Sequence, residues 1–153
     1  MISPMRKVMF VTNSLTGGGA ERAMNLAANE LVGHGWTVAL VPINSGEPDF
    51  VRLVCTTLPL HRQWRSGLVG TLKAFIRFLS VVIKWKPDIL VMACDLPELF
   101  GALLPLRRKI IIVEEAKAPW GTRLVLGRLV RSILRARGVK LSILKEFESE
   151  RGH

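Results

Sequence analysis

Short runs of apolar residues, separated by stretches with helical periodicity, constrain this 153-residue chain more than any other feature. The runs at residues 7–13, 36–43, 89–93 and 109–113 are apolar almost throughout and do not alternate with polar residues. Strands of this kind are buried on both faces, which is typical of a parallel sheet covered by helices. The sequence therefore predicts a doubly wound, mainly parallel α/β domain with helices on both faces of the sheet.

Helical periodicity and turn signals place the remaining elements. Gly33 and Gly35 end the first helical stretch, and Pro87 ends the second. The predicted helices are residues 20–33, 67–85, 97–104 and 122–137, and weaker strand patterns cover residues 51–60 and 139–144.

The predicted helices differ in their apolar faces. The first groups Ala23, Leu26, Ala27 and Leu31 on one side, and the last groups Val125, Leu126, Leu129, Val130, Ile133 and Leu134 opposite Arg128, Arg131 and Arg135. The helix at 67–85 is apolar nearly all round, except for a stripe of Lys73, Arg77 and Lys84. A helix of this kind is buried or touches lipid.

Positive charge is concentrated in two segments. The net charge is +10, and residues 61–86 carry six Lys or Arg without an acid. Residues 107–140 carry ten Lys or Arg against Glu114 and Glu115. Clustered positive charge predicts an acidic partner, such as an anionic lipid surface, a phosphorylated substrate or nucleic acid. Nucleic acid is the least favoured, because no aromatic residues alternate with the charges on a strand and tyrosine is absent.

The cysteines and the N-terminus place the chain in a reducing compartment. Cys55 and Cys94 lie in apolar runs and are predicted to be buried free thiols. No C-x-x-C pair or Cys/His cluster suggests a metal, and no cofactor is expected. Only a strand-length apolar run follows Arg6 and Lys7, which is too short for a signal peptide or a membrane span. We therefore expect a cytoplasmic protein.

A glycine-rich turn is the strongest candidate site. Thr16-Gly17-Gly18-Gly19-Ala20-Glu21-Arg22 connects the first strand to the first helix. Backbone N–H groups of such a turn approach an anion closely, and the helix start favours negative charge. In a doubly wound sheet, ligands lie beyond the carboxyl ends of the strands. The loops there are residues 14–20, 44–48, 94–97 and 114–121, and Asp95 in the third is a candidate substrate-binding residue.

The turn does not match two common phosphate-binding motifs. A dinucleotide fingerprint needs a third glycine where this chain has Arg22, and a carboxylate at the end of the second strand, where it has Pro42-Ile43-Asn44. A P-loop needs a lysine that the turn lacks. A turn without any ligand remains an alternative, and Glu21 is equally well explained as a first-turn acid that complements the helix dipole.

These residues resemble the N-terminal domain of family 4 glycosyltransferases, which have the two-domain GT-B fold built from Rossmann-like halves. The resemblance rests on Gly18-Gly19-Ala20-Glu21-Arg22, Gly33-His34-Gly35-Trp36-Thr37-Val38 and Lys86-Pro87-Asp88-Ile89-Leu90, and it extends over residues 6–135. It implies retaining transfer of a sugar from a nucleotide-sugar donor. It also implies that Gly17, Gly18 and Gly19 lie against the donor's diphosphate, while Glu21 and Arg22 open the following helix.

The sequence departs from this family in two respects. Its loop after the fifth strand has no histidine, so Glu114 or Glu115 is either a contact to the sugar or acceptor or a solvated residue. No E-x7-E pair matches the family's donor-nucleotide domain, since Glu146, Glu148 and Glu150 are too closely spaced. We expect residues 1–144 to form the acceptor-side domain and residues 145–153 a tail. The chain should be inactive alone, as a truncated product or as a subunit completed by a second polypeptide.

The basic segments predict contact with the inner face of the cell membrane. Basic helices with Trp and Phe are typical of interfacial binding, and enzymes of the resembled family often glycosylate lipid-linked or polysaccharide acceptors. The alternatives are a non-catalytic basic module that binds a protein, anionic lipid or nucleic acid, and a dinucleotide-dependent oxidoreductase domain. The predicted membrane-contact residues are Arg62, Trp64, Arg65, Lys73, Arg77, Arg128, Arg131 and Arg135.

Overall fold

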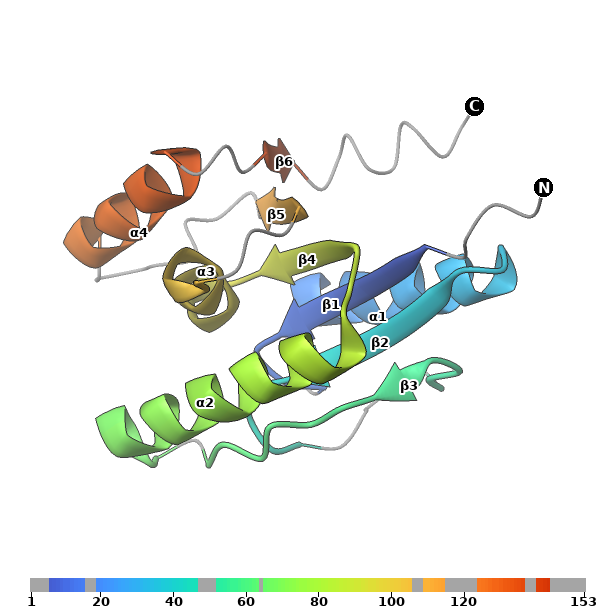
Figure 1. Ribbon diagram of the computed structural model, residues 1–153, viewed down its shortest axis with the longest axis horizontal. Helices are drawn as coiled ribbons and strands as arrows, with labels where there is room; N and C mark the ends of the chain where they lie inside the picture. Colours follow the sequence, from blue (N-terminus) through green and yellow to red (C-terminus); the bar gives the residue numbers. More distant parts are fainter. Residues whose placement is uncertain are drawn as a thin grey trace.

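Parallel strands form one sheet in the computed structural model, which describes residues 6–15, 19–46, 52–63, 65–105, 109–114, 124–136 and 140–143 (Figure 1). Within these residues the sheet has six strands in the order β3-β2-β1-β4-β5-β6. Their bounds are β1 (Lys7–Thr12), β2 (Thr37–Pro42), β3 (Thr56–Thr57), β4 (Ile89–Ala93), β5 (Lys109–Glu114) and β6 (Lys140–Ile143).

The central strands are buried because both of their faces are covered. In β1, Val8 to Thr12 are all buried, and β2 shows the same pattern from Val38 to Pro42. The register pairs Val8 with Val38 on one side and with Ile89 on the other. The predicted doubly wound parallel sheet is therefore confirmed.

The strand predicted at residues 51–60 is much shorter than expected. Only Thr56 and Thr57 pair with β2, opposite Ala39 and Leu40. This segment lies at the edge of the sheet, where β2 is its single neighbouring strand. Leu58 and Leu60 still donate backbone hydrogen bonds to β2, and Leu60 is buried, whereas Val54 is 60% exposed.

Helices cover both faces of the sheet in a three-layer arrangement. Met24 and Ala28 of α1 pack on one face, and helices α2, α3 and α4 pack on the other. In Figure 1, α2 and α3 lie in front of the central strands and α1 lies behind them. The helices are α1 (Gly19–Gly33), α2 (Gly67–Trp85), α3 (Asp95–Leu103) and α4 (Leu124–Ala136).

Two of the predicted helix faces are only partly confirmed. Ala27 and Leu31 of α1 pack against the core as expected, and so do Val130 and Leu134 of α4. In α1, Leu26 is 48% exposed, while Met24 and Asn25 are buried instead. In α4, Leu129 is 58% exposed and Ile133 37%, while Val130 and Leu134 are buried. In each helix the sheet covers only part of the expected face, because the apolar arc of each sequence is wider than the face that the sheet covers.

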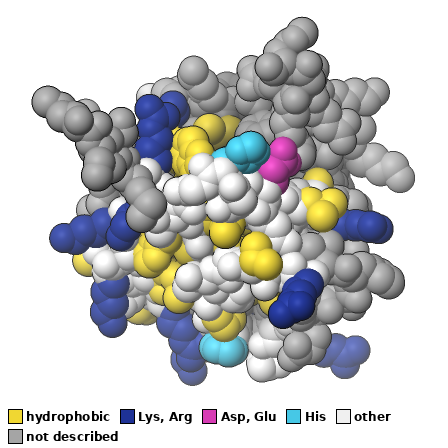
Figure 2. Space-filling model, turned by 90° about the vertical axis from the view of Figure 1, so that its right-hand side faces the viewer, with side chains coloured by type: hydrophobic (Ala, Val, Ile, Leu, Met, Phe, Trp, Pro, Cys, Tyr) yellow, Lys and Arg dark blue, Asp and Glu magenta, His cyan; other side chains and the backbone are white. Residues whose placement is uncertain are grey.

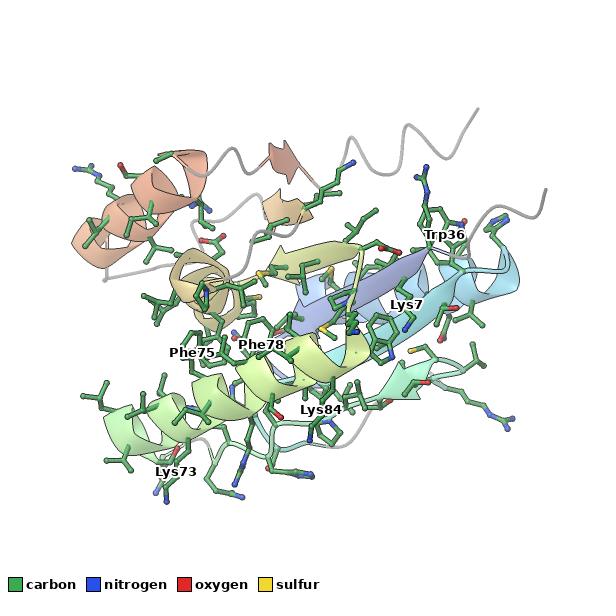
Figure 3. All side chains as sticks on the ribbon, viewed as in Figure 1. Lys7, Trp36, Lys73, Phe75, Phe78 and Lys84 are labelled. Carbon is green, nitrogen blue, oxygen red and sulfur yellow. The ribbon has the colours of Figure 1, made fainter. Side chains whose placement is uncertain are left out.

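Helix α2 contacts the core through only part of its surface. Phe75 and Phe78 pack with Phe100 of α3, with ring centroids 5.4 Å and 5.5 Å from that of Phe100. Figure 3 shows Phe75 and Phe78 on the side of α2 that faces α3, and Lys73 and Lys84 on the opposite side. Within the described part of the chain, no helix has the length and apolarity needed to cross a membrane.

Candidate functional site

The carboxyl ends of β1 and β4 define a topological switch point. These strands are neighbours in the centre of the sheet; the chain continues from β1 to β2 on one side and from β4 to β5 on the other. Loops that leave such a pair diverge and leave a crevice, which is where doubly wound folds bind their ligands. Helix α1 begins at Gly19 after β1, and Cys94 follows β4, so both lie at the carboxyl ends of these two strands.

The first turn of α1 supplies the polar groups on one side of the crevice. The helix begins at Gly19, so the N–H groups of its first turn have no partner within the helix and are available to an anion. Glu21 is partly buried in this turn, and Arg22 is exposed. Gly17 and Gly18 lie outside the described residues.

Cys94 faces this turn from the end of β4. Its Sγ lies 3.9 Å from Oε1 of Glu21, the distance of a weak thiol–carboxylate hydrogen bond. Cys94 has φ 76° and ψ 174°, a combination that glycine favours and that costs other residues about 1–3 kcal/mol. Strained residues of this kind gather at functional sites. The sequence predicts a buried thiol at Cys94, whereas the residue is half-buried and outside any disulfide, and no sequence signal indicates its backbone conformation.

Asn25 is a second residue that the sequence analysis did not identify. It lies one helical turn after Glu21 on α1 and is only 2% exposed. Its Oδ1 is buried and has no hydrogen-bond partner among the residues that the structure describes. A buried amide oxygen without a partner is costly, so this atom is suited to accept a hydrogen bond from a hydroxyl group or a water molecule near the crevice.

Asn44 occupies the position where a dinucleotide-binding fold has its ribose-binding carboxylate. Its Nδ2 donates to the carbonyl of Asn13 at 3.0 Å, and its Oδ1 accepts from Nη1 of Arg62 at 2.7 Å. Nε of Arg62 then donates to Oγ1 of Thr71 in α2 at 3.1 Å. The Asn44 amide is therefore engaged in joining the first loop to α2, and this role disfavours a dinucleotide site.

An ion pair lies on the α3 side of the crevice. Glu98 is fully buried in the first turns of α3, and its Oε1 lies 3.3 Å from Nη2 of Arg131 in α4. The backbone N–H of Glu98 donates to the carbonyl of Cys94 at 3.2 Å. The pair joins α4 to α3, the helix that follows the strained residue Cys94. The sequence does not predict this contact.

The predicted membrane-contact cations fall into two groups. Arg62, Arg77 and Arg131 bond within the fold, Arg77 through Nη1 to the carbonyl of Leu60 at 2.7 Å. Arg65, Lys73 and Arg128 have exposed side chains.

The side chains of several predicted site residues lie outside the described part of the chain. Glu115 and Trp64 lie outside the described residues. Asp95 begins α3, Glu114 ends β5 and Arg135 lies in α4, but their side chains are outside the description.

Positive charge is not confined to the crevice side. Figure 2 views the side on which the central strands begin, and there Lys and Arg side chains are spread around the margin while acidic side chains gather at one place. Away from the crevice, burial raises the pKa of the Cys55 thiol, against a smaller opposing effect of its backbone hydrogen bond.

No protein-family model matches the sequence, and no curated protein matches it. Solved structures do match its fold. Sucrose-phosphate synthase from Thermosynechococcus elongatus superposes with a TM-score of 0.66 at 12% identity, covering 91% of this chain and 47% of that protein. UDP-N-acetylglucosamine 2-epimerase from Rickettsia bellii gives a TM-score of 0.57 at 15% identity, covering 92% and 44%. MurG from Acinetobacter baumannii gives 0.56 at 17% identity, covering 78% and 39%.

These similarities establish the fold. The chain has the Rossmann-like architecture of one half of a GT-B structure, which confirms the fold class and the GT-B resemblance inferred from the sequence. The chain spans less than half the length of each of these three solved structures.

Proposed function

We propose that the chain forms the acceptor-side half of a retaining glycosyltransferase, which moves a sugar from a nucleotide-sugar donor to a lipid-linked or polysaccharide acceptor. The observation that carries the proposal is the start of α1 at the switch point, where Glu21 contacts Cys94, the residue that follows β4. Two of the structures with the same fold are named for sugar-nucleotide or sugar-phosphate chemistry, which favours an anionic sugar ligand for this crevice.

Each group at the crevice would have a definite role. Backbone N–H groups of Gly17, Gly18 and Gly19 would hold the donor's diphosphate, because the start of a helix favours negative charge. Glu21 and the unpaired Oδ1 of Asn25 would accept hydrogen bonds from ligand hydroxyl groups.

The remaining candidates would complete the ligand site. Arg22 would neutralise phosphate charge, and Asp95 would bind substrate. Glu114 or Glu115 would contact the sugar or the acceptor from the loop after β5.

A second domain or subunit would supply the grip on the nucleotide, because no E-x7-E pair occurs in these 153 residues. We therefore expect weak binding of nucleotide sugars by this chain and no transfer by the chain alone. No cofactor is proposed, since the donor itself carries the activated sugar. The non-catalytic module and the oxidoreductase are not favoured, the latter because Asn44 is engaged by Asn13 and Arg62.

Amide NMR spectra recorded during titration with nucleotide sugars test this proposal. We expect shift changes concentrated at residues 19–25 and at Cys94, and we expect Gly19→Val to abolish them by blocking the approach of the diphosphate. Gly33→Ala is the matched control, because Gly33 ends the same helix and an added Cβ meets nothing within 4 Å. Changes that fall elsewhere, or that survive Gly19→Val, would contradict the assignment of the site.

A further inference from the structure

The first seven residues of α2, about two helical turns, lie on the surface, where Thr71 accepts a hydrogen bond from Nε of Arg62 at 3.1 Å. From Gly67 to Lys73 no side chain is buried, and the first buried residue of the helix is Ala74. Leu68 is 85% exposed, Val69 65% and Leu72 58%. An apolar surface of this kind on a helix end marks a site of contact with a partner.

The exposed apolar residues form a continuous row. Leu68, Leu72 and Ile76 follow one another at intervals of four residues, which places them on one side of the helix, and Ile76 is 58% exposed. Figure 1 shows α2 beginning well beyond the carboxyl ends of the central strands, on the same side of the molecule as the candidate crevice.

Basic side chains flank this row without acidic neighbours. Arg65 precedes the helix and is exposed, and Lys73 is exposed next to Leu72 and points away from the core in Figure 3. No Asp or Glu occurs between residues 61 and 86. The surface therefore combines exposed leucines with long cationic side chains, whose apolar stems can follow a lipid surface while their charges reach headgroups.

Positive charge alone does not identify the start of α2 as the membrane-binding surface, because Lys and Arg side chains also surround the opposite end of the molecule (Figure 2). The guanidinium groups of Arg62 and Arg77 bond to Asn44 and to the Leu60 carbonyl, so they hold α2 on the fold. Basic helix α4 also exposes Leu129 at 58% and Ile133 at 37%. The start of α2 differs by its larger exposed apolar surface, in which Leu68 is 85% and Val69 65% exposed, and this surface indicates insertion into a bilayer in addition to attraction toward it.

We propose that residues 65–76 form a bilayer-docking element, in which Leu68, Val69 and Leu72 enter the acyl boundary of an anionic membrane. Arg65 and Lys73 contact the lipid phosphates. The element lies on the crevice side, so a docked molecule would present its carboxyl-end loops to the lipid surface. This inference does not depend on glycosyl transfer, since it concerns a surface that includes no residue of the proposed donor site.

Co-sedimentation of the 153-residue chain with vesicles tests the inference. We expect binding to phosphatidylcholine vesicles that contain phosphatidylglycerol, and weaker binding without the anionic lipid or at high salt. The double variant Leu68→Asp and Leu72→Asp should lower the partition coefficient by at least about tenfold at every salt concentration, because the lost apolar contact is not screened. Lys73→Gln should weaken binding at low salt only.

The matched control is Leu129→Asp, because Leu129 of α4 is 58% exposed, as Leu72 is. It should leave the partition coefficient within about twofold of the unchanged protein. Equal binding by the Leu68/Leu72 variant, or an equal loss in Leu129→Asp, would overturn the proposal. So would a concentration-dependent dimer in gel filtration that Leu72→Asp dissociates, because that surface would then belong to a second copy of the chain.

Discussion

Replacing Arg131 with methionine should destabilise the protein more than replacing a solvated surface arginine would. Glu98 is fully buried, and the exposed fraction of the Arg131 side chain is 24%. Removing one partner of a buried ion pair costs about 3–5 kcal/mol, because the other charge is left buried without a partner. The contact between Nη2 of Arg131 and Oε1 of Glu98 is 3.3 Å long and Arg131 is partly solvated, so we expect a loss of about 2–3 kcal/mol.

This loss should be visible in two measurements. Urea denaturation followed by far-UV circular dichroism should give a lower midpoint without a change in slope. Thermal unfolding should shift downward by about 5–10 °C, given the shift per kcal/mol expected of a domain of this size. The control is Arg128→Met, one turn earlier on α4, where the side chain is exposed and the change should be within about 0.5 kcal/mol.

A double variant separates the cost of an unpaired charge from the loss of an attraction. Glu98→Leu combined with Arg131→Met removes both charges, and apolar replacements of a buried pair are often neutral or stabilising. We therefore expect the double variant to recover most of the stability lost by Arg131→Met. The reasoning is refuted if Arg131→Met unfolds at the urea concentration of the unchanged protein, or if adding Glu98→Leu lowers the midpoint further.

Three further predictions concern Cys94, Cys55 and Arg62. Because Cys94 has a positive φ, Cys94→Gly should be more stable than Cys94→Ala by about 1 kcal/mol in urea denaturation, and a more stable alanine variant would contradict the strain. The pKa of the Cys55 thiol is raised in the folded state, so the unfolded protein loses this proton at a lower pH than the folded protein does. The folded state therefore loses stability relative to the unfolded state as the pH rises past about 8.5. The urea midpoint should therefore fall more between neutral and alkaline pH than that of Cys55→Ser, and parallel pH profiles would exclude the effect. Arg62→Met should cost about 1–3 kcal/mol by leaving the buried Oδ1 of Asn44 unpaired; Arg65→Met is the exposed control, and equal losses would count against the bridge.

The sheet and its helices could be predicted from the sequence because their signals are local. A fully apolar run such as residues 89–93 predicts a buried strand without knowledge of its neighbours. The helix at 67–85 has the bounds that its periodicity and Pro87 predict. The edge strand could not be predicted well, since residues 51–60 are apolar enough for a strand but lie where only one neighbour is available to pair.

Only part of the candidate site could be predicted from the sequence. The glycine turn identified the switch point, because glycines between a strand and a helix have a direct physical meaning. The contact between Cys94 and Glu21, and the pair between Glu98 and Arg131, join residues far apart in the chain. Such contacts depend on how α1, α3 and α4 rotate on the sheet, and the sequences of α1 and α4 predicted only part of their buried faces correctly.

The uneven packing of α2 has a consequence for its motion. Residues 74–82 are fixed by buried Ala74, Phe78 and Val82, whereas the first residues of the helix have no buried side chain to hold them. The helical hydrogen bonds of α2 begin with the N–H of Gly70, which donates to the carbonyl of Ser66 at 3.3 Å. Amide hydrogens should therefore exchange with solvent rapidly over residues 70–73 and slowly from Phe78 to Val82. One continuous helix would then contain a part that opens on its own and a part that opens only when the whole domain unfolds.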